Sequence, residues 1–296
     1  MTTIIRQFLS RKNEVEAQST RAGLAKADRP APSLSLGLRV INPHHIDAER
    51  SIVFIHGLTG GRESTWTAAD AAACWPELYL PNDLSEARII TYGYDADVVN
   101  FWSMASQNTV GDHSQKFLIA LANLRDSTNT STRPLAFIAH SLGGIVCQDA
   151  LLKSKGSPDQ CTHRVLEYTK GILFMGTPHC GSGLGEWAVI GSRFLQYFRR
   201  VNQPILKILQ QQSEVMTRIR QEFHTMLRGL DQSRERKIAI ICFYEELPVR
   251  AIGVIVPKAS ATLDRYASVG IYANHMDMTK FSSDQDPDYR NVLSEL

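Results

Sequence analysis

A series of short apolar segments, each followed by polar or glycine-rich residues, is the feature that most restricts the fold of this 296-residue chain. Several of these segments are continuous apolar runs without polar alternation, which is typical of strands covered by helices on both faces. The sequence therefore predicts an α/β chain with a doubly wound, mostly parallel sheet. The predicted strands are LRVI, SIVFIHG, ARIITYGY, LAFIAHS, GILFMGT, KIAIICFY and VGIYAN, between residues 38 and 274.

The chain is predicted to divide into a short arm and one large domain. Residues 1–36 are polar, rich in Ala and Ser and mildly basic, and we expect a partly disordered arm; a membrane-contacting or targeting segment is the alternative. Residues 37–296 have the length and the 43% hydrophobic content of one domain. Within it, residues 184–230 carry apolar side chains at near-helical spacing, which predicts an inserted helical cap.

Composition excludes several classes of partner. Lys plus Arg (32) nearly balance Asp plus Glu (30), so we expect no nucleic-acid partner. The five cysteines have no metal-ligand spacing, so we expect reduced thiols, no metal and no cofactor. No apolar run reaches the length of about 18 residues that a membrane helix needs. The sequence predicts an intracellular, cytoplasmic protein, with mitochondrial or membrane-associated location as the alternative, and it carries no signal of an oligomeric state.

Ser141 lies in FIAHSLGGIV, where a predicted strand turns directly into a predicted helix. Such a turn is typical of the nucleophile elbow, whose small flanking residues let the strand and the helix approach closely. Gly143 supplies one small position, but Ala139 replaces the usual glycine at the first. The alternative is a structural serine that caps a helix.

A serine nucleophile needs backbone donors for the oxyanion that forms when a carbonyl is attacked. One donor is expected at Leu142, directly after the serine, and the second in FIHGLTGG, at Gly57 or Leu58. His56 precedes the nucleophile in the chain, so we expect it to anchor this loop by hydrogen bonds and not to act as the base.

The base and the acid are expected at the ends of the last two predicted strands, because the chain order in such enzymes is serine, acid, histidine. His275 follows VGIYA, so it is the predicted base. Glu245 ends the preceding apolar run and is the first choice for the acid. Glu246 stays the alternative, since successive side chains of a strand point to opposite faces.

Further residues are candidates for the substrate pocket. Trp187 and Phe194 belong to the apolar cap, where an acyl chain would bind. His179 follows GILFMGTP, and Asp95 lies in YGYDADVVNFW; both are pocket candidates, with a purely structural role as the alternative.

Taken together, FIHGLTGGRESTW, YGYDAD, AHSLGG, GILFMGTPHCGSG, CFYEELP and NHMDMTKF resemble the α/β-hydrolases related to the mitochondrial serine active-site-containing protein. More distantly they resemble GPI inositol deacylases and lipase-like domains. The motifs are most similar to the fungal branch, in which such a domain stands alone or precedes a signalling receptor. The resemblance implies an α/β-hydrolase fold, with the serine and histidine roles at Ser141 and His275 and the acid at Glu245.

Two functions are compatible with these residues. The first is a serine esterase or lipase that cleaves an ester of a lipid or other acyl substrate through an acyl-enzyme on Ser141, with acyl transfer to an alcohol as a variant. Its partners would be a small-molecule or lipid ester and, peripherally, a membrane. The second is a signalling or effector module that keeps the hydrolase fold with weak or lost catalysis.

Overall fold

The computed structural model describes residues 36–43, 48–58, 60–95, 110–179, 184–197, 203–232 and 237–296, with the backbone alone at residues 184 and 203–213. The arm predicted over residues 1–36 lies outside these residues except for Leu36, which is half exposed. The described part contains one seven-stranded sheet with the strand order β1-β3-β2-β4-β5-β6-β7. The strands are β1 (Gly37–Val40), β2 (Arg50–Ile55), β3 (Ala87–Gly93), β4 (Leu135–His140), β5 (Thr169–Met175), β6 (Ala239–Glu245) and β7 (Ala267–Ile271).

The sheet is mostly parallel, as the continuous apolar runs predict. β1 pairs antiparallel with β3, and every other neighbouring pair is parallel. Each predicted strand is present, with ends shifted by a few residues. Since parallel strands require crossover connections, helices are needed on the faces of the sheet.

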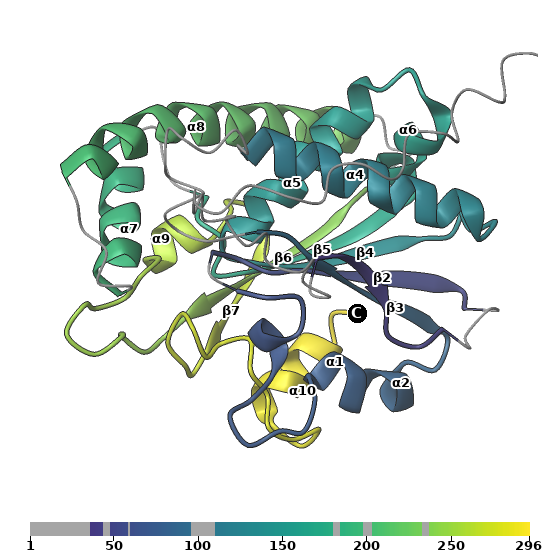
Figure 1. Cartoon of the computed structure of the whole chain (residues 1–296), viewed down its shortest axis with the longest axis horizontal. Coiled ribbons are helices and arrows are strands. Elements are labelled where there is room, and N and C mark those ends of the chain that lie inside the picture. Colours follow the sequence, from purple (N-terminus) through teal and green to yellow (C-terminus); the bar gives the residue numbers. More distant parts are fainter. Residues whose placement is uncertain are drawn as a thin grey trace, which may run out of the picture. The chain divides into compact units, whose positions relative to one another are not determined.

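Two layers of helices cover the sheet. Figure 1 shows α4, α5, α6 and α8 on one face and α1, α2 and α10 on the other. None of the described helices has the length and apolar character needed to cross a membrane. The helices are η1 (Ser64–Trp66), α1 (Trp75–Leu78), α2 (Leu80–Asp83), α4 (Val110–Ser127), α5 (Leu142–Gly156), α6 (Gln160–Glu167), α7 (Leu184–Tyr197), α8 (Gln203–Gln232), α9 (Lys258–Ala261) and α10 (Pro287–Leu293).

The strands are apolar on both faces because each face is buried against helices. In β2, Val53 and Ile55 belong to the hydrophobic cluster under α4, α5 and α8, while Ile52 and Phe54 belong to the cluster under α1 and α10. Side chains of a strand alternate between its faces. Because both faces of the strand are buried, each position needs an apolar side chain, and the runs show no polar alternation.

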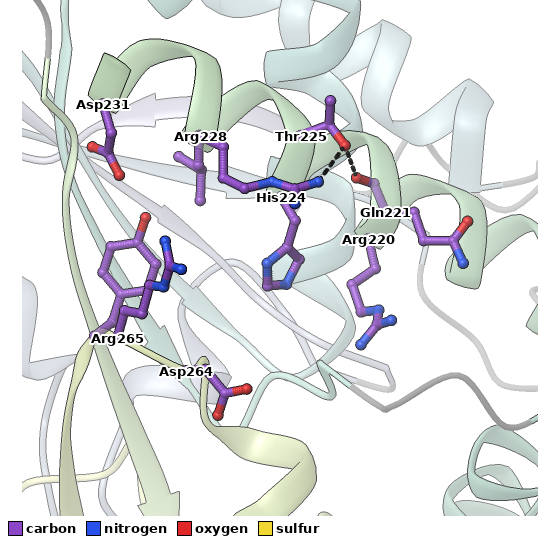
Figure 2. Close-up of a pocket in the computed structure, with 10 residues that line it drawn as sticks. Arg220, Gln221, His224, Thr225, Arg228, Asp231, Asp264 and Arg265 are labelled. Carbon is purple, nitrogen blue, oxygen red and sulfur yellow. Dashed lines mark hydrogen bonds between the residues drawn. The ribbon is translucent and has the colours of Figure 1, made fainter. Parts of the chain in front are cut away.

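The segment predicted as a cap, residues 184–230, forms α7 and α8. α7 contacts α8, and α8 also packs against α5 on the sheet. Ile219 and Phe223 of α8 are fully buried in the cluster shared with the strands. The second half of α8 is thus part of the helix layer that covers the sheet. Another side of this half of α8 faces the segment before β7 (Figure 2). The 3.6-residue period predicts an apolar helix face but not the surface on which that face packs.

Phe54 tests the packing of the face under α1 and α10. Its ring is fully buried and meets the rings of Trp66 and Trp75 edge-on, with centroids 5.0 and 5.3 Å away. Phe54→Ala is expected to lower the free energy of unfolding by about 3–5 kcal/mol, because it removes these contacts and leaves a cavity. Urea unfolding measures this loss. Ile119→Ala, on the exposed side of α4, should cost less than about 0.5 kcal/mol; equal losses would contradict the packing described.

Candidate active site

Ser141 occupies a sharp turn between β4 and α5. Its backbone has φ 52° and ψ −125°, in the region that non-glycine residues seldom adopt. The Ser141 N–H donates to the Met175 carbonyl oxygen of the neighbouring strand at 2.8 Å, which holds the turn against β5. The serine side chain makes no capping hydrogen bond to α5. The Ser141 side chain therefore does not cap α5, which was the alternative role.

The turn can form because glycines stand where the chain segments touch. A Cβ atom on Gly143 would run into the carbonyl oxygens of Ile55 and His56. A Cβ atom on Gly57 would lie 2.7 Å from Cβ of Ser141. Both positions therefore require glycine, and the loop after β2 lies directly against the serine.

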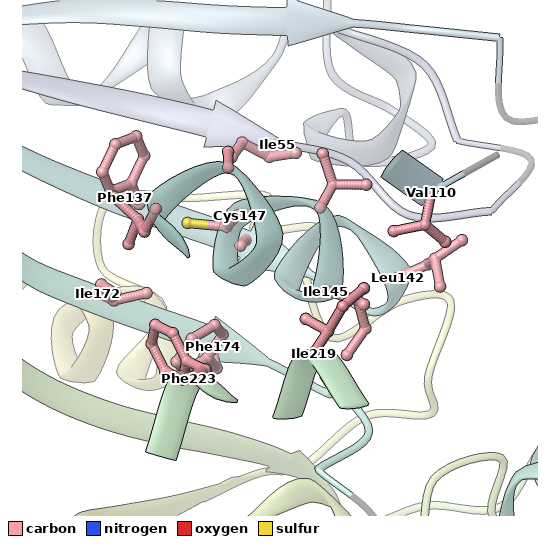
Figure 3. Close-up of a cluster of buried hydrophobic side chains, with 14 of the residues drawn as sticks. Ile55, Val110, Phe137, Leu142, Ile145, Cys147, Ile172, Phe174, Ile219 and Phe223 are labelled. Carbon is pink, nitrogen blue, oxygen red and sulfur yellow. The ribbon is translucent and has the colours of Figure 1, made fainter. Parts of the chain in front are cut away.

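Helix α5 is fixed in place by apolar packing on all sides. Leu142, Ile145 and Cys147 of α5 are buried, and Figure 3 shows α5 lying against the strands that carry Ile55 and Phe137. A helix buried in this way cannot shift its first turn without disturbing the core. The first turn of α5 therefore has a set position beside Ser141.

His275 and Glu245 form a buried pair at the ends of β7 and β6. The His275 Nδ1 atom lies 3.4 Å from Oε2 of Glu245, and both side chains are completely buried. The other carboxylate oxygen, Oε1, accepts a hydrogen bond from the Val256 N–H at 2.5 Å. Oε2 and Nδ1 are close enough for an ion pair but lack the alignment of a hydrogen bond in this structure.

Glu246 lies elsewhere. Its side chain is exposed and packs over Gly270 of β7, where no Cβ atom would fit beside it. The two carboxylates thus point to different sides of the strand end, as the alternation of side chains requires. Only Glu245 is beside His275.

Ser141 and His275 meet the same short stretch at the end of β5. Met175 accepts the hydrogen bond from Ser141, and the next residue, Gly176, has φ 56° and lies so close to His275 that a Cβ atom would be 2.9 Å from Cε1 of the ring. Within the described residues, the Ser141 Oγ atom and both ring nitrogens of His275 are buried and make no hydrogen bond. Serine and histidine therefore lie at the same strand end and are not hydrogen-bonded to each other here.

His140, for which the sequence predicts no role, is a neighbour of the base His275. Its Nε2 atom donates to the His275 carbonyl oxygen at 3.0 Å, and the two rings are 4.9 Å apart. Because a carbonyl only accepts, Nε2 must carry the proton, and burial holds the pKa of His140 well below its usual range. His140 therefore ties the residue before the serine to the backbone of the base; its place next to Ser141 was the one available signal.

His56 anchors the loop after β2, as expected. Its Nδ1 atom donates to the Gly57 carbonyl oxygen at 2.9 Å, and its Nε2 atom accepts from the Tyr94 N–H at 3.2 Å. Burial lowers the pKa of His56 to about 4, so the ring stays neutral. These bonds hold Gly57 and Leu58 next to the serine.

A small apolar cavity lies over Ser141. Its lining includes Leu58 and Leu142, the predicted oxyanion positions, together with Trp187 and Phe194 of α7. Leu142 is the first residue of α5, so its N–H is one of the donors that a helix leaves unused. The remaining lining residues, which the sequence analysis did not single out, are Pro178, Ile190, Gly191 and Met216.

The cavity is nearly filled. About 10 Å³ is free, roughly the space of one water molecule. The Phe194 ring lies edge-on to His275, with centroids 5.2 Å apart, so one side chain of α7 touches both the cavity and the base.

Two predicted pocket residues are not in this lining. Asp95 is exposed, and His179 is buried with its Nδ1 atom accepting from Gln148 at 3.0 Å. Burial lowers the pKa of His179 to about 3. A role of these two side chains in substrate binding stays a prediction. Among the described residues, no group of three or more His, Cys, Asp or Glu side chains could hold a metal ion.

Comparisons with known proteins identify related sequences. Among curated proteins the chain is similar to Protein SERAC1 of Homo sapiens, 26% identical over 270 residues covering 82% of this chain and 38% of the relative. It is also similar to Protein SERAC1 of Danio rerio, 24% identical over 309 residues covering 94% of this chain and 44% of the relative. The chain thus spans less than half the length of these relatives. They are animal proteins, so the fungal branch is not supported, and the relation to GPI inositol deacylases stays a prediction.

Solved structures give weaker similarities. A lipase-esterase related protein from Clostridium acetobutylicum aligns with a TM-score of 0.43 at 10% identity, covering 88% of this chain and 98% of that one. A thermophilic esterase from Thermogutta terrifontis aligns with a TM-score of 0.41 at 14% identity, covering 83% and 88%. The family model described as "Putative serine esterase (DUF676)" matches residues 45–236, more than half of the chain. The chain therefore belongs to this family, and its mostly parallel sheet covered by helices is the architecture that the sequence predicts.

Proposed function

We propose that the protein cleaves an ester of a lipid or other acyl substrate through an acyl-enzyme on Ser141. The observation that carries this proposal is the strained turn at Ser141, which presents an unbonded Oγ atom to an apolar cavity beside the buried pair of His275 and Glu245. An apolar lining favours an acyl chain over a polar group, because burying unpaired polar groups is costly.

The proposed reaction begins when His275 Nε2 takes the proton of the Ser141 hydroxyl as Oγ attacks the ester carbonyl. The N–H groups of Leu142 and Leu58 would then donate to the oxyanion, and Glu245 would stabilise the imidazolium through Nδ1. His275 next returns the proton to the leaving alcohol. Water, activated by the same ring, releases the acid from the serine; attack by an alcohol instead would give acyl transfer.

Catalysis by this route requires two small movements. Ser141 Oγ and His275 Nε2 must come into hydrogen-bond contact, and the side chains that fill the cavity must give way to an acyl chain. Hydrogen bonds of catalytic groups are often poorly aligned without substrate and tighten when it binds. Their misalignment here is also what favours the second candidate, an effector module with weak or lost catalysis.

A fluorophosphonate probe separates these two candidates. We expect the probe to label the wild-type protein covalently at Ser141, since labelling needs an activated serine, and to leave Ser141→Ala unlabelled. Intact-mass spectrometry measures the adduct, and denatured protein is the control. Absence of label from the native wild type would favour the effector module.

Substitution of each glutamate tests the proposed acid. Glu245→Gln is expected to reduce ester turnover by about 10³–10⁴-fold, because an amide cannot stabilise the imidazolium. Glu246→Gln is the matched control and should stay within about twofold, since its side chain is exposed over Gly270. Steady-state kinetics with a short chromogenic ester measures both; the reverse order would assign the acid to Glu246.

Trp187→Ala tests the assignment of the cavity to the acyl chain. Removing the indole opens space in a cavity that has almost none, so turnover of long-chain esters should rise relative to butyrate esters by about tenfold. Val189→Ala, on the exposed side of the same helix, should leave this ratio unchanged. A ratio that moves in neither variant would mean that the acyl chain binds elsewhere.

The proposal includes an expected peripheral contact with membranes, where lipid esters reside. An intracellular or mitochondrial location remains a prediction from the sequence.

A further inference from the structure

A second and larger cavity lies between the C-terminal half of α8 and the segment that leads into β7 (Figure 2). About 370 Å³ is free, far more than over Ser141, and none of its lining residues lines the serine cavity. We propose that this cavity is a binding site for the phosphate group of a polar phosphate ester. The inference does not depend on the proposed ester chemistry.

Three arginines from two separate segments line this cavity, and the Arg228 guanidinium group donates to the Thr225 hydroxyl at 3.3 Å (Figure 2). Arg220 and Arg228 come from α8, and Arg265 comes from the segment before β7; Asp231 and Asp264 lie at the same cavity. Within the described part of the chain, none of the three arginines forms an ion pair with either aspartate. The three guanidinium groups outnumber the two carboxylates at this cavity.

Two ring or guanidinium nitrogens in the cavity wall are buried without a partner. The Arg220 Nε atom and the His224 Nε2 atom have no hydrogen bond to any described residue. Burial, followed by the charges of Arg220 and Arg228, lowers the pKa of His224, and the charge of Asp264 opposes this. The Arg220 Nε–H is a buried donor of a charged group, and an anionic acceptor would satisfy it.

Arg265 adds an independent observation. Its backbone has φ 77°, in the left-handed region that a non-glycine residue adopts only when its surroundings enforce it. Such residues cluster at ligand sites. Here the residue with this backbone conformation is Arg265, and its side chain lies at the cavity, opposite α8 (Figure 2).

Phosphate is the anion that fits these donors best. The planar fork of a guanidinium group matches two phosphate oxygens at once, and several such groups share the charge of a phosphate monoester. Asp231 and Asp264 can then accept hydrogen bonds from hydroxyl groups on the rest of the ligand. This donor and acceptor set favours a phosphorylated polar molecule over a bare carboxylate.

The site is connected to the serine cavity through α8. Met216, which lines the serine cavity, lies one turn before Arg220 on the helix. Arg220 also donates through Nη1 to the His179 carbonyl oxygen at 3.4 Å, and the preceding residue, Pro178, lines the serine cavity. Because Arg220 has this structural contact, it is not used as the test residue.

Isothermal titration with inorganic phosphate and with glycerol phosphate tests the assignment. We expect both to bind the wild-type protein at millimolar concentration above the effect of chloride at equal ionic strength. The double variant Arg228→Gln/Arg265→Asn should weaken binding by about tenfold per guanidinium lost. Asparagine tolerates the left-handed conformation at position 265. Circular dichroism verifies folding, and Arg228→Gln alone, on an exposed helix position, serves if the double variant does not fold.

Arg218→Gln is the matched control. Arg218 lies on α8 outside the cavity lining, 67% exposed and 4.0 Å from Glu222, so its loss removes the same charge from the same helix. Binding should change by less than about twofold. Equal weakening in Arg218→Gln and in Arg228→Gln alone would overturn the site, because the effect would then be one of net charge.

Vesicles distinguish the two sources of phosphate. Sedimentation with phosphatidylcholine vesicles, with and without phosphatidic acid, is measured for the same variants. Binding of soluble phosphate without sedimentation assigns a free phosphate ester as the ligand. Sedimentation that depends on phosphatidic acid, without binding of soluble phosphate, assigns a lipid headgroup. In each case the double variant must lose the binding. Binding of neither by the wild type, or undiminished binding by the double variant, refutes the proposal.

Discussion

The backbone of Ser141 is held in a conformation that a serine does not adopt by itself, and the arrangement of the site follows from it. A residue at positive φ of this kind costs on the order of 1–3 kcal/mol, which the surrounding fold must offset. The offset comes from the buried strand β4, the fully packed helix α5 and the hydrogen bond from Ser141 to Met175. Glycine at 143 lets α5 reach the end of β2. The strain therefore places the hydroxyl above the sheet, at the start of α5.

The buried pair of His275 and Glu245 depends on the same sheet edge. Taking a carboxylate out of water costs several kcal/mol unless it is hydrogen-bonded or paired. Glu245 receives one hydrogen bond from the Val256 backbone, and its other oxygen faces His275. His140 holds the backbone of His275 by donating to its carbonyl oxygen, through a ring that burial keeps neutral. Glu245 and His140, which are both far from His275 in the sequence, therefore hold the base in place.

The sequence was most informative where burial leaves a strong pattern. The strands could be predicted because a sheet covered on both faces needs continuous apolar runs, and the strand ends then placed Ser141, His275 and Glu245 at one edge. Asp95 and His179 also follow strands, yet a position after a strand does not say which way a loop side chain turns. The sequence predicted an inserted cap over residues 184–230. The apolar period of the second half of α8 does not identify the surface on which this half packs. The one signal for His140 was its place next to Ser141, since its contact with His275 joins residues far apart in the sequence.

The central claim is that Ser141 and His275 act on one reacting centre together with the N–H groups at the start of α5 and after β2. A crystal structure of the covalent phosphonate adduct tests this most directly, since the phosphonyl group mimics the tetrahedral intermediate. The account predicts the phosphonyl oxygen within hydrogen-bond distance of the Leu142 and Leu58 N–H groups, with His275 Nε2 hydrogen-bonded to the adduct. An adduct whose oxygen points away from both N–H groups, with His275 still out of contact, would contradict it.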